Sequence, residues 1–126
     1  MQVPAELRYS KDHEWIRVDG SVATIGITDY AQDALGDVVY VEIPKVGTRV
    51  GSGDRFGEVE STKSVSDVYA PLSGVVVAVN DAVASSPELL NSDPYGAGWL
   101  CAIELDDAAQ VQALLDADAY RALIEG

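Results

Sequence analysis

The sequence contains a single cysteine, a single histidine and a single methionine among its 126 residues. One cysteine excludes an internal disulfide and any CxxC metal or redox motif. Cys101 stands in an apolar, strand-like run, so we expect a buried structural thiol. The one histidine, His13, lies beside Glu14, and we expect a structural role for it rather than general-base catalysis. The sequence also has no GxSxG motif, no glycine-rich phosphate loop and no set of metal ligands. We therefore predict a protein that is not an enzyme and holds no metal.

Basic residues are also scarce. Eight Lys and Arg face 21 Asp and Glu, giving a net charge of −13. Phosphates would repel such a surface, which argues against nucleic acid, whereas partners with basic docking faces would be attracted. No apolar run is long enough to span a membrane. The start, Met1-Gln2-Val3-Pro4, has neither a basic n-region nor an Arg-rich transit pattern. If the chain is complete, we expect it to remain in the cytoplasm.

Short strands dominate the pattern, and the length fits one domain spanning residues 1–126. Asp19-Gly20 predicts a turn between strands at 14–18 and 22–27. A short helix near 29–35 follows, with Thr28 at its start and Gly36 at its end. Further strands are predicted at 38–43, 48–50, 56–61, 65–69, 74–79 and 99–105, with a helical turn opening at Ser86-Pro87.

The last segment, residues 107–124, is predicted to be helical and to pack on the body of the domain. Asp116 and Asp118 are expected to divide it into two pieces. Its apolar side is formed by Val111, Leu114, Leu115, Leu123 and Ile124.

An internal repeat runs through the middle of the chain. Its two copies span residues 37–63 and 64–90. The first contains Val41, Pro44, Gly47, Val50 and Asp54, and the second contains Val68, Pro71, Gly74, Val77 and Asp81 at a constant offset. Valine favours strands, whereas proline and glycine punctuate them. We therefore predict two similar sets of strands that pair about a pseudo-twofold axis and close a small flattened barrel.

Lys63 falls at the junction of the two copies, between strand-like runs at 56–60 and 65–69. Two such arms joined by small polar residues predict a β-hairpin with the lysine at its tip. Acylation of that amine would remove its charge and could attach a long prosthetic group. The alternative is an ordinary surface lysine.

The order and spacing of several fragments decide between these two interpretations. They include His13-Glu14-Trp15, the stretch 22–32, Phe56-Gly57-Glu58-Val59-Glu60-Ser61-Thr62-Lys63, Tyr69-Ala70-Pro71, Pro87-Glu88-Leu89-Leu90-Asn91 and Gly98-Trp99-Leu100. Almost from end to end, the chain resembles the lipoyl-bearing H proteins of the glycine cleavage system. The resemblance implies a mainly β fold, an antiparallel sandwich or flattened barrel of the biotinyl/lipoyl type, with a core at about 22–105. Biotin is disfavoured because Thr62 and Ser64 flank Lys63, where biotin carriers have methionines.

The resemblance further implies that Lys63 carries lipoate covalently, as N6-lipoyllysine. The carrier would take the aminomethyl group of glycine from the pyridoxal-phosphate-dependent glycine decarboxylase to the tetrahydrofolate-dependent aminomethyltransferase. It would then present its dithiol to dihydrolipoyl dehydrogenase. Glu14 and Asp67 match positions that line the resting site of the loaded arm, where a carboxylate would favour the cationic amine. The alternative is that Glu14 caps a turn and Asp67 is a solvated surface acid. Asp12 has a more doubtful role.

Recognition by lipoylating enzymes should depend on the placement of the hairpin and on nearby carboxylates, notably Glu60. We expect a monomer. Two alternative functions stay open: a lipoyl relay that donates lipoate to other acyl-carrier domains, and an unmodified interaction module that has lost the chemistry. The intact sequence around Lys63 argues against the second alternative.

Overall fold

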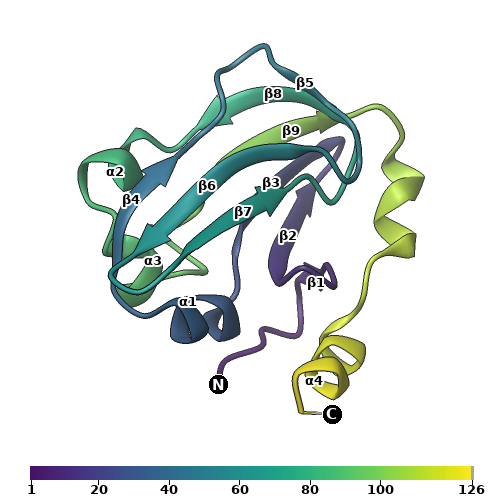
Figure 1. Cartoon of the computed structure of the whole chain (residues 1–126). Coiled ribbons are helices and arrows are strands. Elements are labelled where there is room, and N and C mark those ends of the chain that lie inside the picture. The colour runs from purple at the N-terminus through teal and green to yellow at the C-terminus, as the bar shows by residue number, and fades with distance from the viewer. Residues whose placement is uncertain (126) are drawn as a thin grey trace.

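The computed structural model describes residues 1–125, and they form two antiparallel sheets that lie against each other (Figure 1). The larger sheet has the order β1-β2-β3-β9-β8-β5, and the smaller has the order β4-β6-β7. The larger sheet contains β1 (Arg8–Tyr9), β2 (Glu14–Asp19), β3 (Val22–Ile27), β9 (Cys101–Leu105), β8 (Gly74–Val79) and β5 (Arg49–Val50). The smaller contains β4 (Val38–Glu42), β6 (Arg55–Ser61) and β7 (Val65–Tyr69).

The mainly β, antiparallel prediction is therefore confirmed, but the sheets do not close into a barrel. β4 and β7 are the free edges of the smaller sheet, and no strand pairing within residues 1–125 joins them to the larger one. The barrel that the repeat predicted is not completed by β5, which is only two residues long and pairs with β8 alone.

Short helices connect the strands. α1 (Asp29–Leu35) begins after Thr28, whose hydroxyl accepts a hydrogen bond from the Ala31 amide, and ends at Gly36, where φ is 82°. These caps are the ones that the sequence predicts. α2 (Asp81–Ser85) was not predicted; the Asn80 side chain caps its first turn. The helical turn expected after Pro87 is α3 (Leu89–Ser92).

The C-terminal segment is divided as expected. A 3₁₀ helix, η1 (Ala108–Ala113), is separated from α4 (Ala117–Glu125) by an extended stretch. In that stretch Leu115 forms a bridge with Tyr9 of β1. α4 lies beside β1 and the N-terminal segment (Figure 1). No helix within residues 1–125 is both long enough and apolar enough to cross a membrane.

The core has two parts. The main cluster fills the space between the sheets, with Ile16, Ile25, Val59, Val76 and Ile103 among its members. Cys101 belongs to this cluster, and its burial raises the pKa of the thiol to about 12, as expected for a structural cysteine.

The second cluster joins the N-terminal region to α4, and it consists of Val3, Leu7, Tyr9, Trp15, Ala117 and Tyr120. The C-terminal tail therefore packs on the body as predicted, but Tyr120 is its fully buried anchor. Leu123, expected on the apolar side, is 46% exposed.

The internal repeat holds for only part of each copy. Val41 and Val68 are both buried and lie on the strands that flank β6. Val50 is buried, however, whereas Val77 is 44% exposed. The first copy continues into a strand, β6, while the second continues into a helix, because Asn80 caps α2 at that point.

Candidate functional site

The tip of the β6-β7 hairpin consists of Thr62, Lys63 and Ser64. Ser61, the last residue of β6, organises this turn from below. Its backbone amide donates to the Ser64 carbonyl at 2.8 Å, and its side-chain oxygen accepts from the amides of Lys63 and Ser64 at 3.3 and 3.0 Å. A buried serine therefore fixes the backbone of the turn. This leaves the Lys63 side chain as the part of the tip that is free to carry something.

The tip is also held from outside the hairpin. The Thr62 amide donates to the carbonyl of Asp37, in the loop that follows α1. Asn91 of α3 fixes the same loop, since its side-chain nitrogen donates to the Gly36 carbonyl at 2.9 Å and its oxygen accepts from the Val38 amide at 2.9 Å. Asn91 ends the stretch Pro87-Glu88-Leu89-Leu90-Asn91, and the sequence assigns it no role. Nothing in a single sequence shows that it lies beneath the hairpin.

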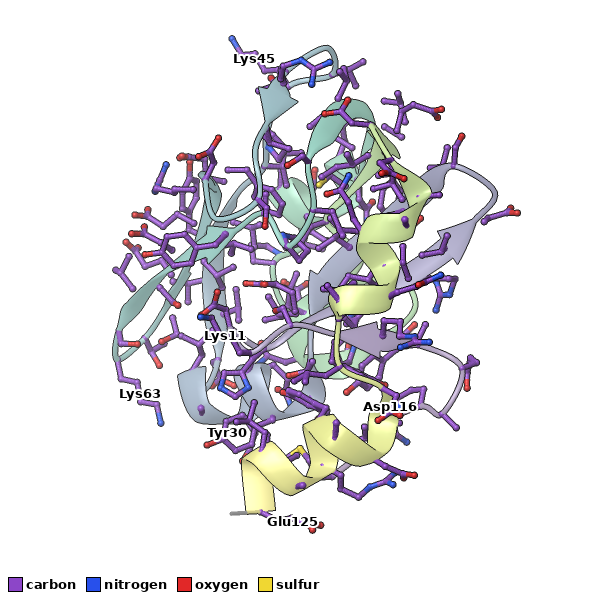
Figure 2. The ribbon with its side chains drawn as sticks, turned by 90° about the vertical axis from the view of Figure 1, so that its right-hand side faces the viewer. Lys11, Tyr30, Lys45, Lys63, Asp116 and Glu125 are labelled. Carbon is purple, nitrogen blue, oxygen red and sulfur yellow. The ribbon has the colours of Figure 1, made fainter. Side chains whose placement is uncertain are left out.

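Lys63 itself is exposed and extends from the end of the hairpin beside α1 (Figure 2). Its aliphatic stem lies over Gly36: a Cβ atom added at Gly36 would come within 3.2 Å of Lys63 Cε. No carboxylate within residues 1–125 forms an ion pair with the amine. Lys45 lies at the opposite end of the molecule (Figure 2). Lys11 lies in the turn between the short strand β1 and β2, whereas Lys63 stands at the tip of the longer β6-β7 hairpin.

A groove of about 300 Å³ lies beside the tip. One wall is the face of α1 that carries Tyr30, Ala31, Ala34 and Leu35. The other is formed by residues 64–66, and Asp12 and His13 close one end. The wall is largely apolar and Asp12 is an exposed carboxylate. The groove therefore has the chemistry that would fit an aliphatic arm attached to Lys63.

Glu14 does not line this groove. It is 2% exposed, and its carboxyl accepts a hydrogen bond from the Ser10 hydroxyl at 2.5 Å. Burial raises the pKa of Glu14 to about 7, against the opposing effect of the Ser10 hydrogen bond, and the nearby Asp12 raises it further. Ser10 lines a second hollow, of about 380 Å³, which shares only Asp12 with the groove and contains no residue of the hairpin tip.

Asp67 points to the outer face of the smaller sheet. Its carboxylate pairs with the Arg55 Nε at 2.9 Å. No hydrogen bond or ion pair within residues 1–125 connects Asp67 to Glu14. Glu60 lies on the same outer face, directly across from Tyr40 on one side and Val65 on the other. The structure thus brings Glu60 and Asp67 to one surface and places Glu14 beneath another.

His13 has a structural environment, as expected. Its φ is 70°, its ring lies 4.7 Å from that of Tyr30, and its Nδ1 is 2.8 Å from the Tyr120 hydroxyl. Burial lowers its pKa, although Asp12 acts in the opposite direction. Within residues 1–125, no three His, Cys, Asp or Glu side chains are grouped as metal ligands would be.

A rigid sandwich that presents one lysine on a braced hairpin tip, beside an apolar groove, defines a class of carrier protein. Comparison with known proteins makes the class specific. The family model of the glycine cleavage H-protein matches residues 7–126. The glycine cleavage system H proteins of Myxococcus xanthus and Cronobacter sakazakii are 53% and 58% identical to this chain. Each alignment covers 98% of this chain, with 95% and 96% of the respective relative.

A solved structure agrees with this comparison. The crystal structure of a glycine cleavage system H protein from Mycobacterium marinum superposes with a TM-score of 0.90 at 42% identity. The match covers 98% of this chain and 100% of the other. The chain belongs to the glycine cleavage H-protein family, the lipoyl carriers of the glycine cleavage system.

Proposed function

We propose that Lys63 is the lipoylated residue of this carrier. The observation that supports this most directly is the tip itself: Lys63 is exposed and without an ion-pair partner in residues 1–125, on a turn braced by Ser61 and by the Asp37 carbonyl. When bound, the lipoyl group supplies a dithiolane that takes up the one-carbon fragment and is reduced, chemistry that no side chain of this protein offers.

In this scheme the chain is a single, monomeric and non-catalytic domain that leaves the reactions to its partners. It moves the aminomethyl group of glycine from glycine decarboxylase to aminomethyltransferase, and it is then reoxidised by dihydrolipoyl dehydrogenase. A rigid support suits this role because several enzymes must recognise the same tip. The residues that the chain contributes are those that brace Lys63 and those that line the groove. We place the protein in the cytoplasm, together with the enzymes that it would serve.

The groove beside α1 is the proposed resting place of the arm. Its apolar wall excludes water, and the carboxylate of Asp12 at its end favours a cationic amine. Glu14, buried behind Ser10, and Asp67, paired with Arg55, do not line the groove, and they are proposed to act on the same amine only through their charge. For Asp67 this requires that the bond to Arg55 open, and for Glu14 it requires ionisation of a buried carboxyl.

The test of the assignment is Lys63→Arg, which keeps the charge and removes the acylatable amine. We expect complete loss of lipoyl attachment and of support for glycine decarboxylation, with an unchanged unfolding midpoint. Intact mass and peptide mapping of protein isolated from lipoate-replete cells provide the measurement, and Lys45→Arg is the matched control. Lipoylation of the Lys63→Arg protein, or a lipoyl group mapped to Lys11 or Lys45 in the wild type, would overturn the proposal.

A further inference from the structure

His13 connects the groove beside α1 to a buried pair of hydroxyl groups. Its ring lines the groove and lies 4.7 Å from the ring of Tyr30, which lines the groove as well. Its Nδ1 is 2.8 Å from the hydroxyl of Tyr120, a fully buried residue that does not line the groove. No hydrogen bond of the other ring nitrogen, Nε2, is present in residues 1–125. Nε2 is therefore the polar atom that the ring offers to the groove.

The surroundings of Thr28 decide which ring nitrogen of His13 carries the proton. The Thr28 side chain is fully buried, and its oxygen accepts a hydrogen bond from the Ala31 amide at 3.2 Å. The same oxygen lies 2.7 Å from the Tyr120 hydroxyl. A buried hydroxyl hydrogen without an acceptor is costly, and the Tyr120 oxygen is the acceptor that the structure provides within residues 1–125. Thr28 therefore donates to Tyr120.

This direction continues to His13. The Tyr120 oxygen accepts from Thr28, and its own hydrogen is then donated to Nδ1 of His13, the remaining polar atom beside it. A ring nitrogen that accepts a hydrogen bond has no proton, so the proton of the neutral imidazole lies on Nε2. The opposite direction would leave the Thr28 hydrogen without an acceptor in the interior.

The same chain of hydrogen bonds keeps the ring uncharged. In the imidazolium both nitrogens carry a proton, so Nδ1 would have to donate to Tyr120, and one of the two hydroxyl hydrogens would lose its acceptor. Burial acts in the same direction and lowers the pKa of His13, against the opposing effect of Asp12. His13 thus offers the groove a fixed N–H donor that has no positive charge.

The two polar groups at this end of the groove differ in what they bind. Asp12 offers an anion and His13 offers a neutral donor. A lipoyl arm that carries an aminomethyl group has two matching groups, a cationic amine and the sulfur atom that is left free. From Gly36, over which the Lys63 stem lies, back to Tyr30 beside His13, α1 spans about 9 Å by the rise of an α-helix. The carbon chain of a lipoyl group is long enough to cover this span.

We propose that His13 positions the sulfur end of the arm: Thr28 and Tyr120 hold its proton on Nε2, and this N–H donates to the free sulfur atom of the loaded or reduced arm. The inference rests on the proposed function of Lys63. A neutral ring is essential to it, because an imidazolium beside Asp12 would repel the cationic amine that the carboxylate attracts. The sulfur held by this donor is less accessible to reagents in solution.

The first experiment is nitrogen NMR of the unlipoylated full chain, in which His13 is the single histidine. Proton–nitrogen correlations across the ring identify the nitrogen that carries the proton. We expect the Nε2–H form in the wild type at neutral pH. In Tyr120→Phe we expect a mixture of the two neutral forms, because Nδ1 loses its donor. A wild-type ring that is protonated on Nδ1, alone or together with Nε2, would overturn the proposal.

The second experiment measures how fast the thiols of the reduced, lipoylated chain react with iodoacetamide, followed by intact mass. Cys101 is buried in the folded protein, so the reaction reports on the arm. His13→Asn suits the backbone at this position, where φ is 70°, and keeps an acceptor near the place of Nδ1 but has no counterpart of Nε2. We expect its thiols to react about twofold to tenfold faster than those of the wild type, the effect of one lost hydrogen bond.

Two further variants separate the donor from general damage. Lys45→Arg, at the opposite end of the molecule (Figure 2), should react at the wild-type rate. Tyr120→Phe should react at a rate between those of the wild type and His13→Asn, because part of its population keeps the proton on Nε2. A wild-type rate in His13→Asn would overturn the proposal, and so would a faster reaction in Tyr120→Phe than in His13→Asn. If Lys63 of the wild type carries no lipoyl group, the proposed function fails, whereas the NMR result still decides the state of His13.

Discussion

Glu14 shows how much the surroundings of one residue decide. The sequence places it beside the histidine and suggests a surface or groove carboxylate, whereas the fold buries it to 2% exposure with a serine hydroxyl as its hydrogen-bond partner. A carboxyl that is hard to ionise in the folded state binds its proton more tightly there than in the unfolded chain. The free energy of unfolding should therefore depend on pH through Glu14.

We expect Glu14→Gln to remove that dependence. Burial raises the Glu14 pKa from 4.5 to about 7 in the folded protein. Between these values the folded state holds more protons than the unfolded state, so the contribution of Glu14 to stability falls as pH rises, by about 3 kcal/mol in all. The amide side chain of the variant cannot ionise. Urea unfolding should therefore show the variant gaining on the wild type between pH 5 and pH 8.

The comparison is made as the difference between variant and wild type at each pH, so that the other titrating groups cancel. Glu58→Gln, on the outer face of the smaller sheet beside Arg55, is measured in the same way for comparison. An equal difference at pH 5 and pH 8 for Glu14→Gln would mean that the buried carboxyl titrates as it does in the unfolded chain.

At the scale of elements, the loop after α1 links three segments that are distant in sequence. Asn91 of α3 contacts Gln32, Gly36 and Val38, and the carbonyl of the intervening Asp37 accepts from the hairpin tip. The lysine is therefore positioned by a side chain 28 residues further along the chain.

Asn91→Ala should loosen the tip while the hairpin survives. The variant loses three side-chain hydrogen bonds, which costs about 2–3 kcal/mol of folding free energy. Hydrogen exchange at the Thr62 amide should become faster because its acceptor, the Asp37 carbonyl, is no longer held in place. Asn80→Ala is the control: it removes the α2 cap and the bonds to Ala97 and Trp99, with similar destabilisation but unchanged exchange at Thr62. Equal exchange at Thr62 in both variants would contradict this account.

Strands and helix caps were predictable because their signals are local. Thr28, Gly36 and Asp19-Gly20 act within a few residues, and the structure has the elements they predict. α2, the open edges of the smaller sheet and the roles of Asn91 and Tyr120 were not predictable, because they depend on which distant segments meet. The repeat includes both predictable and unpredictable features. It placed the first strands correctly but could not show that matching residues would have different environments, as Val50 and Val77 do.

The two matching glycines provide a test of this difference. Gly47 has φ of 94° and open space around it, so Gly47→Val adds only backbone strain, about 1–2 kcal/mol. A Cβ atom at Gly74 would instead meet the Glu104 carbonyl and come within 2.6 Å of the Ile103 side chain on β9. Gly74→Val should therefore be the more destabilising change, as measured by urea unfolding at one pH. If Gly47→Val proves the more destabilising change, backbone strain at positive φ costs more stability than contact with β9.

At the scale of the whole molecule, segments near the two ends of the chain hold the elements that line the groove. The N-terminal Gln2 amide donates to Asp29 at the start of α1, and the Tyr120 hydroxyl of α4 lies 2.8 Å from His13 Nδ1 and 2.7 Å from the Thr28 hydroxyl. Thr28 caps α1, and His13 lines the groove. The tail is thus part of the support of the site, although it lies far from Lys63 in sequence.

Tyr120→Phe tests this support with the smallest possible change. The ring can keep its stacked position 4.7 Å from Tyr9, but the His13 nitrogen and the Thr28 hydroxyl lose a buried partner. We expect a loss of about 1–3 kcal/mol in the free energy of unfolding, together with faster hydrogen exchange in the first turn of α1. Tyr30→Phe is the control, because no hydrogen bond of its hydroxyl is present in residues 1–125, and it should leave both quantities near wild type. If Tyr120→Phe is as stable as Tyr30→Phe, the tail covers the body only by apolar contact, and the hydroxyl network contributes nothing to the support of α1.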